Sequence, residues 1–116
     1  MQEITKRQRN FLRKLANPLK PTVMLGKQGL TEQIVDKVNR ELDAHELIKV
    51  RFLEHKDERK QLTATILEET GSSLVILIGH VATLYRQQAD PERRQIRLPH
   101  GDAQADDAGE DDDDDE

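Results

Sequence analysis

The sequence has 116 residues, of which 34% are hydrophobic and 35% charged, so it is long enough for one small domain with a lean core. It contains no cysteine, which excludes disulfides, zinc–thiolate sites and cysteine nucleophiles and fits a cytoplasmic protein. No apolar run approaches the length of a membrane-spanning helix, and the N-terminus lacks the apolar stretch of a signal peptide, so we expect no membrane association.

The formal net charge of −5 hides an uneven distribution of charge along the chain. Ten of the 23 acidic residues lie between Asp102 and the C-terminus, where there is no basic residue. Residues 1–101 therefore hold 13 acidic and 18 basic residues, a net charge of +5. A basic domain joined to an acidic segment is typical of proteins that bind nucleic acids.

The spacing of apolar residues predicts seven elements. A helix over residues 5–16 gathers Phe11, Leu12 and Leu15 on one side and ends before Pro18. The others, in chain order, are a strand over 21–25, a helix from its N-cap Thr31 to about residue 44, a strand over 47–53, a helix from a cap at Asp57 to Gly71, and a hairpin of strands over 74–78 and 81–86.

The order of these elements, α-β-α-β-α-β-β, indicates an α/β fold. Alternating strands and helices imply βαβ units and a compact domain in which helices pack on a four-stranded mixed sheet. We assign residues 1–98 to this domain, with residues 87–98 trailing off the last strand. Residues 101–116 contain no apolar residue larger than alanine, so we expect residues 99–116 to form a disordered acidic tail.

The loop Gly26-Lys27-Gln28-Gly29 joins a predicted strand to a predicted helix. Glycines let the main chain approach a ligand closely, and the N–H groups of such a loop and of the helix start at Thr31 attract anions. Lys27 adds a cation, and one class of RNA-binding module clamps the sugar–phosphate backbone with a GxxG loop of this form. The alternative is a turn that needs glycine only for its shape.

Basic residues also gather on one face of the first predicted helix. Lys6, Arg9 and Arg13 fall within one narrow arc, Lys14 flanks them, and Glu3 is the only acidic residue nearby. A face that only keeps a protein soluble usually mixes both signs of charge, so this one-sided face favours phosphate binding. A solvated surface without a ligand is the alternative.

Three more basic residues extend this set. Lys20 continues the run towards the GxxG loop, whereas Lys49 and Arg51 either carry it across the sheet or lie under a helix end. The predicted RNA-binding residues are Lys6, Arg9, Arg13, Lys14, Lys20, Gly26, Lys27, Gln28, Gly29, Thr31, Lys49 and Arg51.

The sequence shows no pattern of a catalytic or metal site. The four histidines have no metal-ligand spacing, no nucleophile elbow surrounds the serines, and no carboxylate stands in an apolar setting. We therefore expect no enzymatic activity, no metal and no cofactor. Because Phe11 and Phe52 fall on predicted core faces, contacts to RNA should involve phosphates more than stacked bases.

The ordered set of motifs resembles the YhbY-type RNA-binding domain, also called the CRM domain (chloroplast RNA splicing and ribosome maturation), over about residues 2–98. The resemblance implies a fold similar to the C-terminal domain of a bacterial translation initiation factor and RNA binding through the GxxG loop. For single-domain bacterial members it implies association with precursors of the large ribosomal subunit. Gln28 stands where the family more often has asparagine, and the acidic tail is outside the family pattern. The motifs are Leu19–Pro21, Leu25–Thr31, His45–Val50 and Thr83–Arg86.

These observations favour a monomeric, noncatalytic RNA-binding protein that contacts ribosomal RNA of the large subunit during ribosome biogenesis, where the ribosomal part rests on resemblance alone. An alternative is a protein-interaction adaptor on pre-ribosomal particles that acts through its acidic tail. An RNA-processing enzyme is a third possibility, for which no acid–base constellation is visible. A steep salt dependence of RNA binding would separate the first two.

Overall fold

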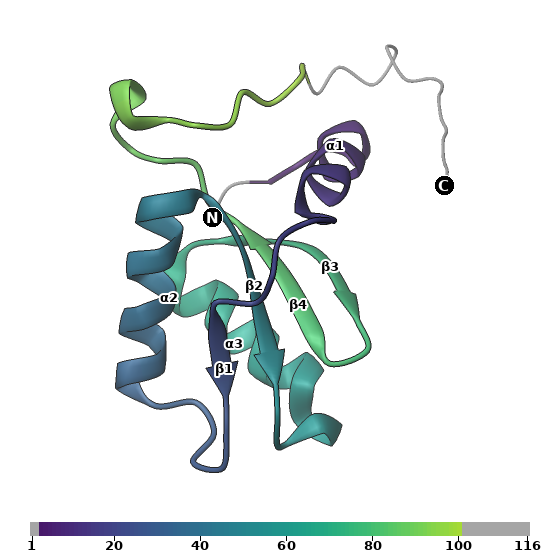
Figure 1. Cartoon of the computed structure of the whole chain (residues 1–116), viewed down its shortest axis with the longest axis vertical. Helices are drawn as coiled ribbons and strands as arrows, with labels where there is room; N and C mark the ends of the chain where they lie inside the picture. The colour runs from purple at the N-terminus through teal and green to yellow at the C-terminus, as the bar shows by residue number, and fades with distance from the viewer. Residues whose placement is uncertain (1–2, 101–116) are drawn as a thin grey trace.

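The computed structural model describes residues 3–100 and has the predicted α/β architecture (Figure 1). Within this range, three α-helices pack on a four-stranded mixed sheet with the strand order β1-β2-β4-β3. Residues 101–116, most of the predicted acidic tail, lie outside the described part of the chain. No helix in the described range is long and apolar enough to span a membrane. The elements are α1 (Lys6–Ala16), β1 (Val23–Leu25), α2 (Glu32–His45), β2 (Leu47–Phe52), α3 (Arg59–Thr70), β3 (Ser73–Ile78) and β4 (Val81–Tyr85).

The strand pairing explains how the chain forms one sheet. β1 and β2 are parallel and connected by α2, which is the predicted βαβ unit. β3 and β4 form the predicted antiparallel hairpin through Gly79 and His80, and β4 also pairs antiparallel with β2. α3 therefore connects β2 to the edge strand β3, with β4 between the two strands.

Local capping interactions explain three of the six ends of the α-helices in the described range. Thr5 Oγ1 accepts the N–H of Gln8 at 3.1 Å and Gln8 Oε1 accepts the N–H of Thr5 at 3.1 Å, a capping box that starts α1. Thr31 caps α2 as predicted, because its Oγ1 accepts the N–H of Ile34 at 3.2 Å. Gly71, with φ at 67°, ends α3 in the left-handed conformation, also as predicted.

The predicted cap at Asp57 is wrong. Asp57 lies inside a 3₁₀ turn, Lys56–Glu58, that His55 begins with a left-handed φ of 58°. Helix α3 starts after this turn at Arg59, and its N-cap residue Glu58 makes no side-chain capping bond. A residue inside the turn does not have the extended main chain of a capping position.

Two hydrophobic clusters lie on opposite faces of the sheet. Helices α2 and α3 cover one face and α1 packs on the other, so the domain has three layers (Figure 1). Leu15 of α1, expected on the buried side, is 40% exposed. The main core consists of Val23, Leu25, Val38, Leu42, Ile48, Val50, Phe52, Ile66, Ala82 and Leu84. The α1 core consists of Leu12, Ala16, Leu47, Val75 and Tyr85.

The segment after β4 does not trail off as expected, because a buried carboxylate holds it against the domain. Glu46, at the end of α2, is 1% exposed and has a left-handed φ of 67°. Its side chain accepts the N–H groups of Gln88 at 2.8 Å, Gln95 at 2.7 Å and Ile96 at 2.8 Å. Ile96 and Leu98 then pack on the α1 core. Glu46 is therefore a buried carboxylate whose oxygens are satisfied by main-chain donors, and it attaches the C-terminal segment to the domain.

Candidate nucleic-acid interface

The GxxG loop lies at the end of β1, where the chain turns into α2 (Figure 1). The N–H of Gly29 donates to the carbonyl of Gly26 at 2.9 Å, and Gly29 has a φ of 72°, which requires a residue that tolerates the left-handed region. Lys27 and Gln28 are exposed at the tip, and their main-chain N–H groups meet no acceptor among residues 3–100. The loop thus offers donors and one cation to an anion.

A histidine distant in sequence supports this loop. His55 Nε2 lies 2.9 Å from the carbonyl oxygen of Lys27, and His55 Nδ1 lies 3.2 Å from Glu58 Oε1. The hydrogen bond to Lys27, together with Glu58 and Glu54, raises the pKa of His55 above its ordinary value of 6.5. No local pattern in the sequence predicts this contact, because 28 residues separate the two partners.

The basic face of α1 lies at the other end of the molecule from the GxxG loop (Figure 1). Lys6, Arg9, Arg13 and Lys14 are all exposed. The Arg9 guanidinium donates to the carbonyl of Leu74 at 3.3 Å, so this face of α1 is directed towards β3. The loop and the helix face therefore do not form one local patch.

Arg51 is exposed on the sheet face that carries α1, whereas Lys49 is half-buried beside the C-terminal end of α1. Together with Arg13 they line a depression of about 420 Å³ on the sheet face that carries α1. Lys49 Nζ also donates to the carbonyl of Leu19 at 3.0 Å and so ties the α1–β1 connection to β2. The depression is lined by Arg13, Ala16, Asn17, Pro21, Lys49, Arg51, Ile76, Ile78, Val81 and Thr83.

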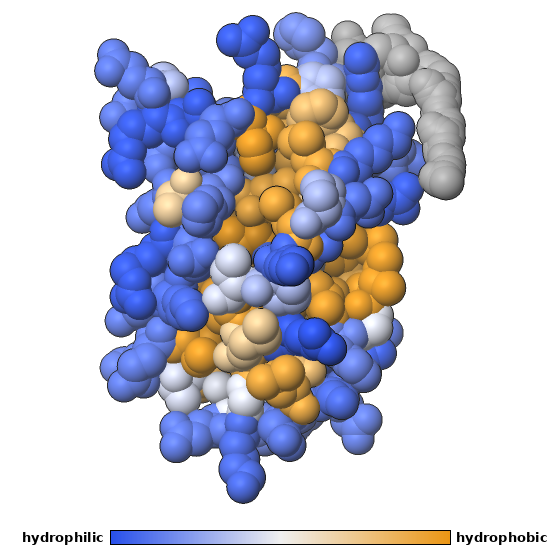
Figure 2. All heavy atoms as spheres, in the orientation of Figure 1, coloured by the Kyte–Doolittle hydropathy of each residue, from blue (hydrophilic) through white to orange (hydrophobic). Residues whose placement is uncertain are grey.

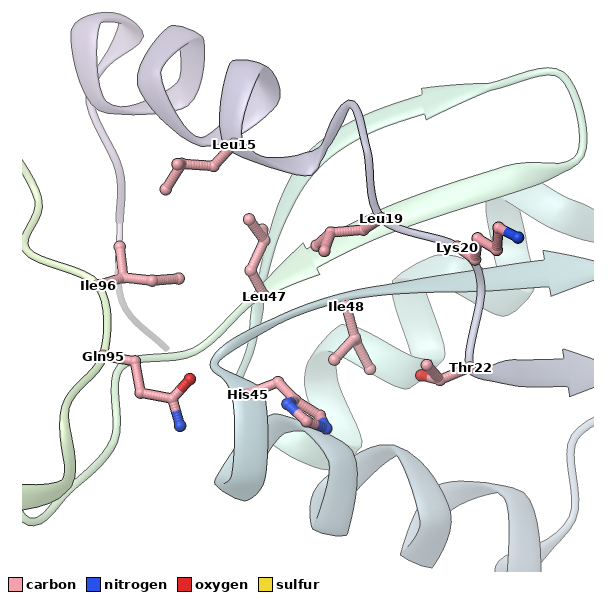
Figure 3. A pocket seen from close by; sticks show the side chains of 9 residues that line it. All are labelled: Leu15, Leu19, Lys20, Thr22, His45, Leu47, Ile48, Gln95 and Ile96. Atoms are coloured by element: carbon pink, nitrogen blue, oxygen red, sulfur yellow. The ribbon is translucent and has the colours of Figure 1, made fainter.

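Lys20 is exposed in the connection between α1 and β1. It lines a second, largely apolar depression of about 470 Å³ that includes Leu15, Leu19 and His45 (Figure 3). This depression lies between α1, the C-terminal end of α2 and the segment that holds Ile96. Figure 3 shows the Lys20 ammonium directed away from the apolar side chains of this depression.

The CRS1 / YhbY (CRM) domain model matches residues 4–86 of this chain. The chain belongs to the CRM domain family. This match covers α1 to β4 and includes every predicted RNA-binding residue.

Relatives of this CRM domain have similar lengths. An "RNA-binding protein" of Haemophilus influenzae is 41% identical over 100 residues, which cover 85% of this chain and 98% of the relative. The "Probable RNA-binding protein YqeI" of Bacillus subtilis is 35% identical over 97 residues, which cover 83% of this chain and 99% of the relative. The solution structure of a hypothetical protein from Staphylococcus aureus matches with a TM-score of 0.69 and 34% identity, covering 84% of this chain and all of that one.

The aromatic residues of this CRM domain belong to its cores. Phe52 and Tyr85 are buried, and Phe11 is half-buried against the α1 core. Burial, and secondarily the charge of Glu46, raises the pKa of Tyr85 to about 12. Among residues 3–100 there is no group of three side chains that could hold a metal ion. The buried Phe52 and Tyr85 thus offer no surface on which a base could stack.

Proposed function

We propose that this CRM-domain protein binds RNA without acting on it chemically, and that the GxxG loop clamps the RNA backbone. The observation that carries the proposal is the loop tip, where the N–H groups of Lys27 and Gln28 are open beside the Lys27 ammonium. Relatives named as RNA-binding proteins support it. The net charge of +5 over residues 1–101 suits a polyanionic ligand.

The target that we propose is ribosomal RNA of the large subunit in pre-ribosomal particles, bound by a cytoplasmic monomer. The resemblance of the motifs to single-domain bacterial CRM proteins supports this choice. Crosslinking in cells, followed by sequencing of the attached RNA, tests it directly. Crosslinks spread evenly over messenger and transfer RNA, without enrichment of precursor large-subunit RNA, would exclude the ribosomal assignment.

Salt dependence tests whether the basic face of α1 contacts phosphates. If about four to six phosphates are neutralised, log affinity for single-stranded RNA should fall with log salt with a slope of roughly −3 to −4. Replacing Lys6, Arg9 and Arg13 by Gln should make this slope shallower by about two units. A control with Lys37, Arg40 and Lys60 replaced by Gln removes the same charge from exposed positions of α2 and α3.

If the two triple variants have equal salt slopes, the change in slope depends only on net charge, and the basic face of α1 is solvated surface without bound phosphate. A shallow slope for the wild type itself would favour the alternative function, an adaptor that binds basic ribosomal proteins through the ten acidic residues beyond residue 101.

A further inference from the structure

One face of the sheet is only partly covered by a helix. The α1 core sits over the paired residues Leu47 and Tyr85 at one end of this face. Two further rows of paired residues on the same face lie nearer the GxxG loop, and most of their residues are not part of the α1 core. In one row Met24 pairs with Arg51, Arg51 with Val81, and Val81 with Ile78; in the next Lys49 pairs with Thr83, and Thr83 with Ile76.

These rows share one face because alternate residues of a strand point to the same side. Val23, Val50 and Ala82, which alternate with them, are buried in the main core under α2 and α3. A register shift between Leu74 and Ile76 allows both Val75 and Ile76 to contact the α1 side.

The open face combines cations with exposed apolar side chains. Ile78 is 63% exposed and Met24 is 44% exposed, and Arg51 is exposed between them. No acidic residue of the described chain lines the depression that Arg13, Lys49 and Arg51 surround. In Figure 2 an apolar patch lies below α1 on the β3 side of the sheet, flanked by hydrophilic side chains.

We propose that this open sheet face is a docking groove for an unpaired RNA segment. Its phosphates lie at Arg13 and Arg51, and one or two bases rest on Ile76, Ile78 and Val81. This inference rests on the proposed function and deepens it, because it names single-stranded RNA as the ligand of a second contact surface. A wholly cationic set of charged side chains complements a polyanion.

The apolar half of the groove selects unpaired RNA over duplex RNA. A duplex keeps its base faces stacked and presents phosphates and 2′-hydroxyl groups, so it has nothing apolar to place on Ile78. An unpaired strand can turn a base onto this surface. An aliphatic side chain has no π-face, so we expect it to hold a base more weakly than an aromatic side chain does.

The groove also connects the two predicted contact regions. Met24 at its lower edge stands two residues before Gly26, and Arg13 at its upper edge belongs to the basic face of α1. A single strand can therefore run from the GxxG loop across the open face to α1. A GxxG clamp alone holds about four nucleotides, so affinity should continue to rise with oligonucleotide length beyond that point.

Variants at Ile78 test the groove because this residue is mostly exposed and its replacement should leave the fold intact. Ile78→Ser should lower the affinity for a twelve-nucleotide unpaired RNA about fivefold, and Ile78→Tyr should raise it about fivefold by base stacking. Neither variant should change the affinity for a four-nucleotide RNA or for a blunt duplex. Leu19→Ser, at an exposed leucine of the other depression, is the matched control and should bind as the wild type does.

A charge variant tests the other half of the groove. Arg51→Gln should make the salt slope for the twelve-nucleotide RNA shallower by about 0.7, the contribution of one phosphate contact. Arg40→Gln removes the same charge from the exposed side of α2 and should leave the slope closer to that of the wild type.

Several outcomes would contradict the proposal that this face binds unpaired RNA. Unchanged long-RNA affinity in both Ile78 variants, or equal losses on duplex and unpaired RNA, would show that bases do not dock there. A wild-type dimer in sedimentation that Ile78→Ser dissociates would assign the face to a second copy of the chain. A wild type that binds none of these RNAs refutes the proposed function itself, whereas a wild type that binds all lengths equally refutes only the groove.

Discussion

The imidazole Nε2 of His55 lies 2.9 Å from the carbonyl oxygen of Lys27, and this contact fastens the GxxG loop to the connection between β2 and α3. The other ring nitrogen lies 3.2 Å from Glu58 Oε1. Both neighbours are hydrogen-bond acceptors, and only the protonated ring can donate to both at once. The loop that we propose as the RNA clamp is therefore held most firmly when the His55 ring is protonated.

We predict that the stabilising effect of His55 depends on pH. Its pKa in the folded protein is raised above 6.5, so the stabilisation is complete below pH 6.5 and is lost as the pH rises through the folded-state pKa. NMR titration of the ring should give a pKa above 6.5. The difference in unfolding free energy between the wild type and His55→Asn should be largest below pH 6.5 and should shrink as the pH rises above 6.5 through the folded-state pKa.

His55→Asn is a suitable comparison because asparagine tolerates the left-handed main chain that His55 adopts at φ 58°. It removes the side-chain contact without adding backbone strain. A pH-independent stability difference would show that the contact with Lys27 does not require the charged ring.

The two loop glycines should respond differently to substitution. A Cβ at Gly26 would have no neighbour within 4 Å, whereas Gly29 has a φ of 72° and its Cβ would lie 3.6 Å from His55. Gly26→Asp should therefore keep the fold and lower RNA affinity at least about tenfold, because it places a negative charge where a phosphate binds. Gly29→Ala should lower stability by about 1 kcal/mol. Binding isotherms and thermal melts measure the two effects.

Gly26→Ala is the control for Gly26→Asp, since it adds a Cβ without a charge. If a folded Gly26→Asp variant binds RNA with the affinity of the wild type, the loop does not bind phosphate and needs glycine only for the shape of the turn.

The sequence predicted those features that depend on near neighbours in the chain. Thr31 caps α2 and Gly71 ends α3 because both effects act within one helical turn. Phe52, which falls on a core face of its predicted strand, lies in the main core.

Contacts between distant segments were not predictable in this way. No local pattern around Glu46 predicts that its side chain accepts hydrogen bonds from residues 88–96. Likewise, no local pattern around His55 predicts its contact with Lys27. The spacing of apolar and basic residues along α1 predicted which residues form its basic face. It did not predict the direction of that face relative to the sheet. That direction follows from the packing of Leu12 and Ala16 on Tyr85 and its neighbours.

We predict that Glu46 is the main attachment of the C-terminal segment. Glu46→Ala leaves the N–H groups of Gln88, Gln95 and Ile96 without their acceptor, which should lower the unfolding free energy by about 3 kcal/mol. Hydrogen exchange at those three amides should accelerate. Glu46→Gln keeps one acceptor oxygen and should lose about half as much. Unchanged exchange rates in Glu46→Ala would show that packing of Ile96 holds the segment instead.

The acidic residues beyond residue 101 should compete with RNA for the basic face of α1. The described chain ends beside this helix, because the Gln8 side chain donates to the carbonyl of Pro99 at 3.0 Å. The ten acidic residues that follow in the sequence are attached to the chain near this helix, and such a tether would favour a contact with Lys6 and Arg9 through a high effective concentration. Solubilisation without any contact is the alternative role.

Deletion of residues 102–116 separates these two roles, since it changes the formal charge from −5 to +5. If the carboxylates compete with RNA, the truncated protein should bind nonspecific RNA more tightly at low salt, and this gain should shrink as salt screens the contact. The α1 amide resonances, including those of Lys6 and Arg9, should also shift on truncation. A chain in which the acidic residues of this segment are replaced by Ser and Gln keeps the tether and removes its charge, so it should behave like the deletion. Equal affinities at low salt together with unmoved α1 resonances would leave the segment as a solubilising extension or a handle for another protein.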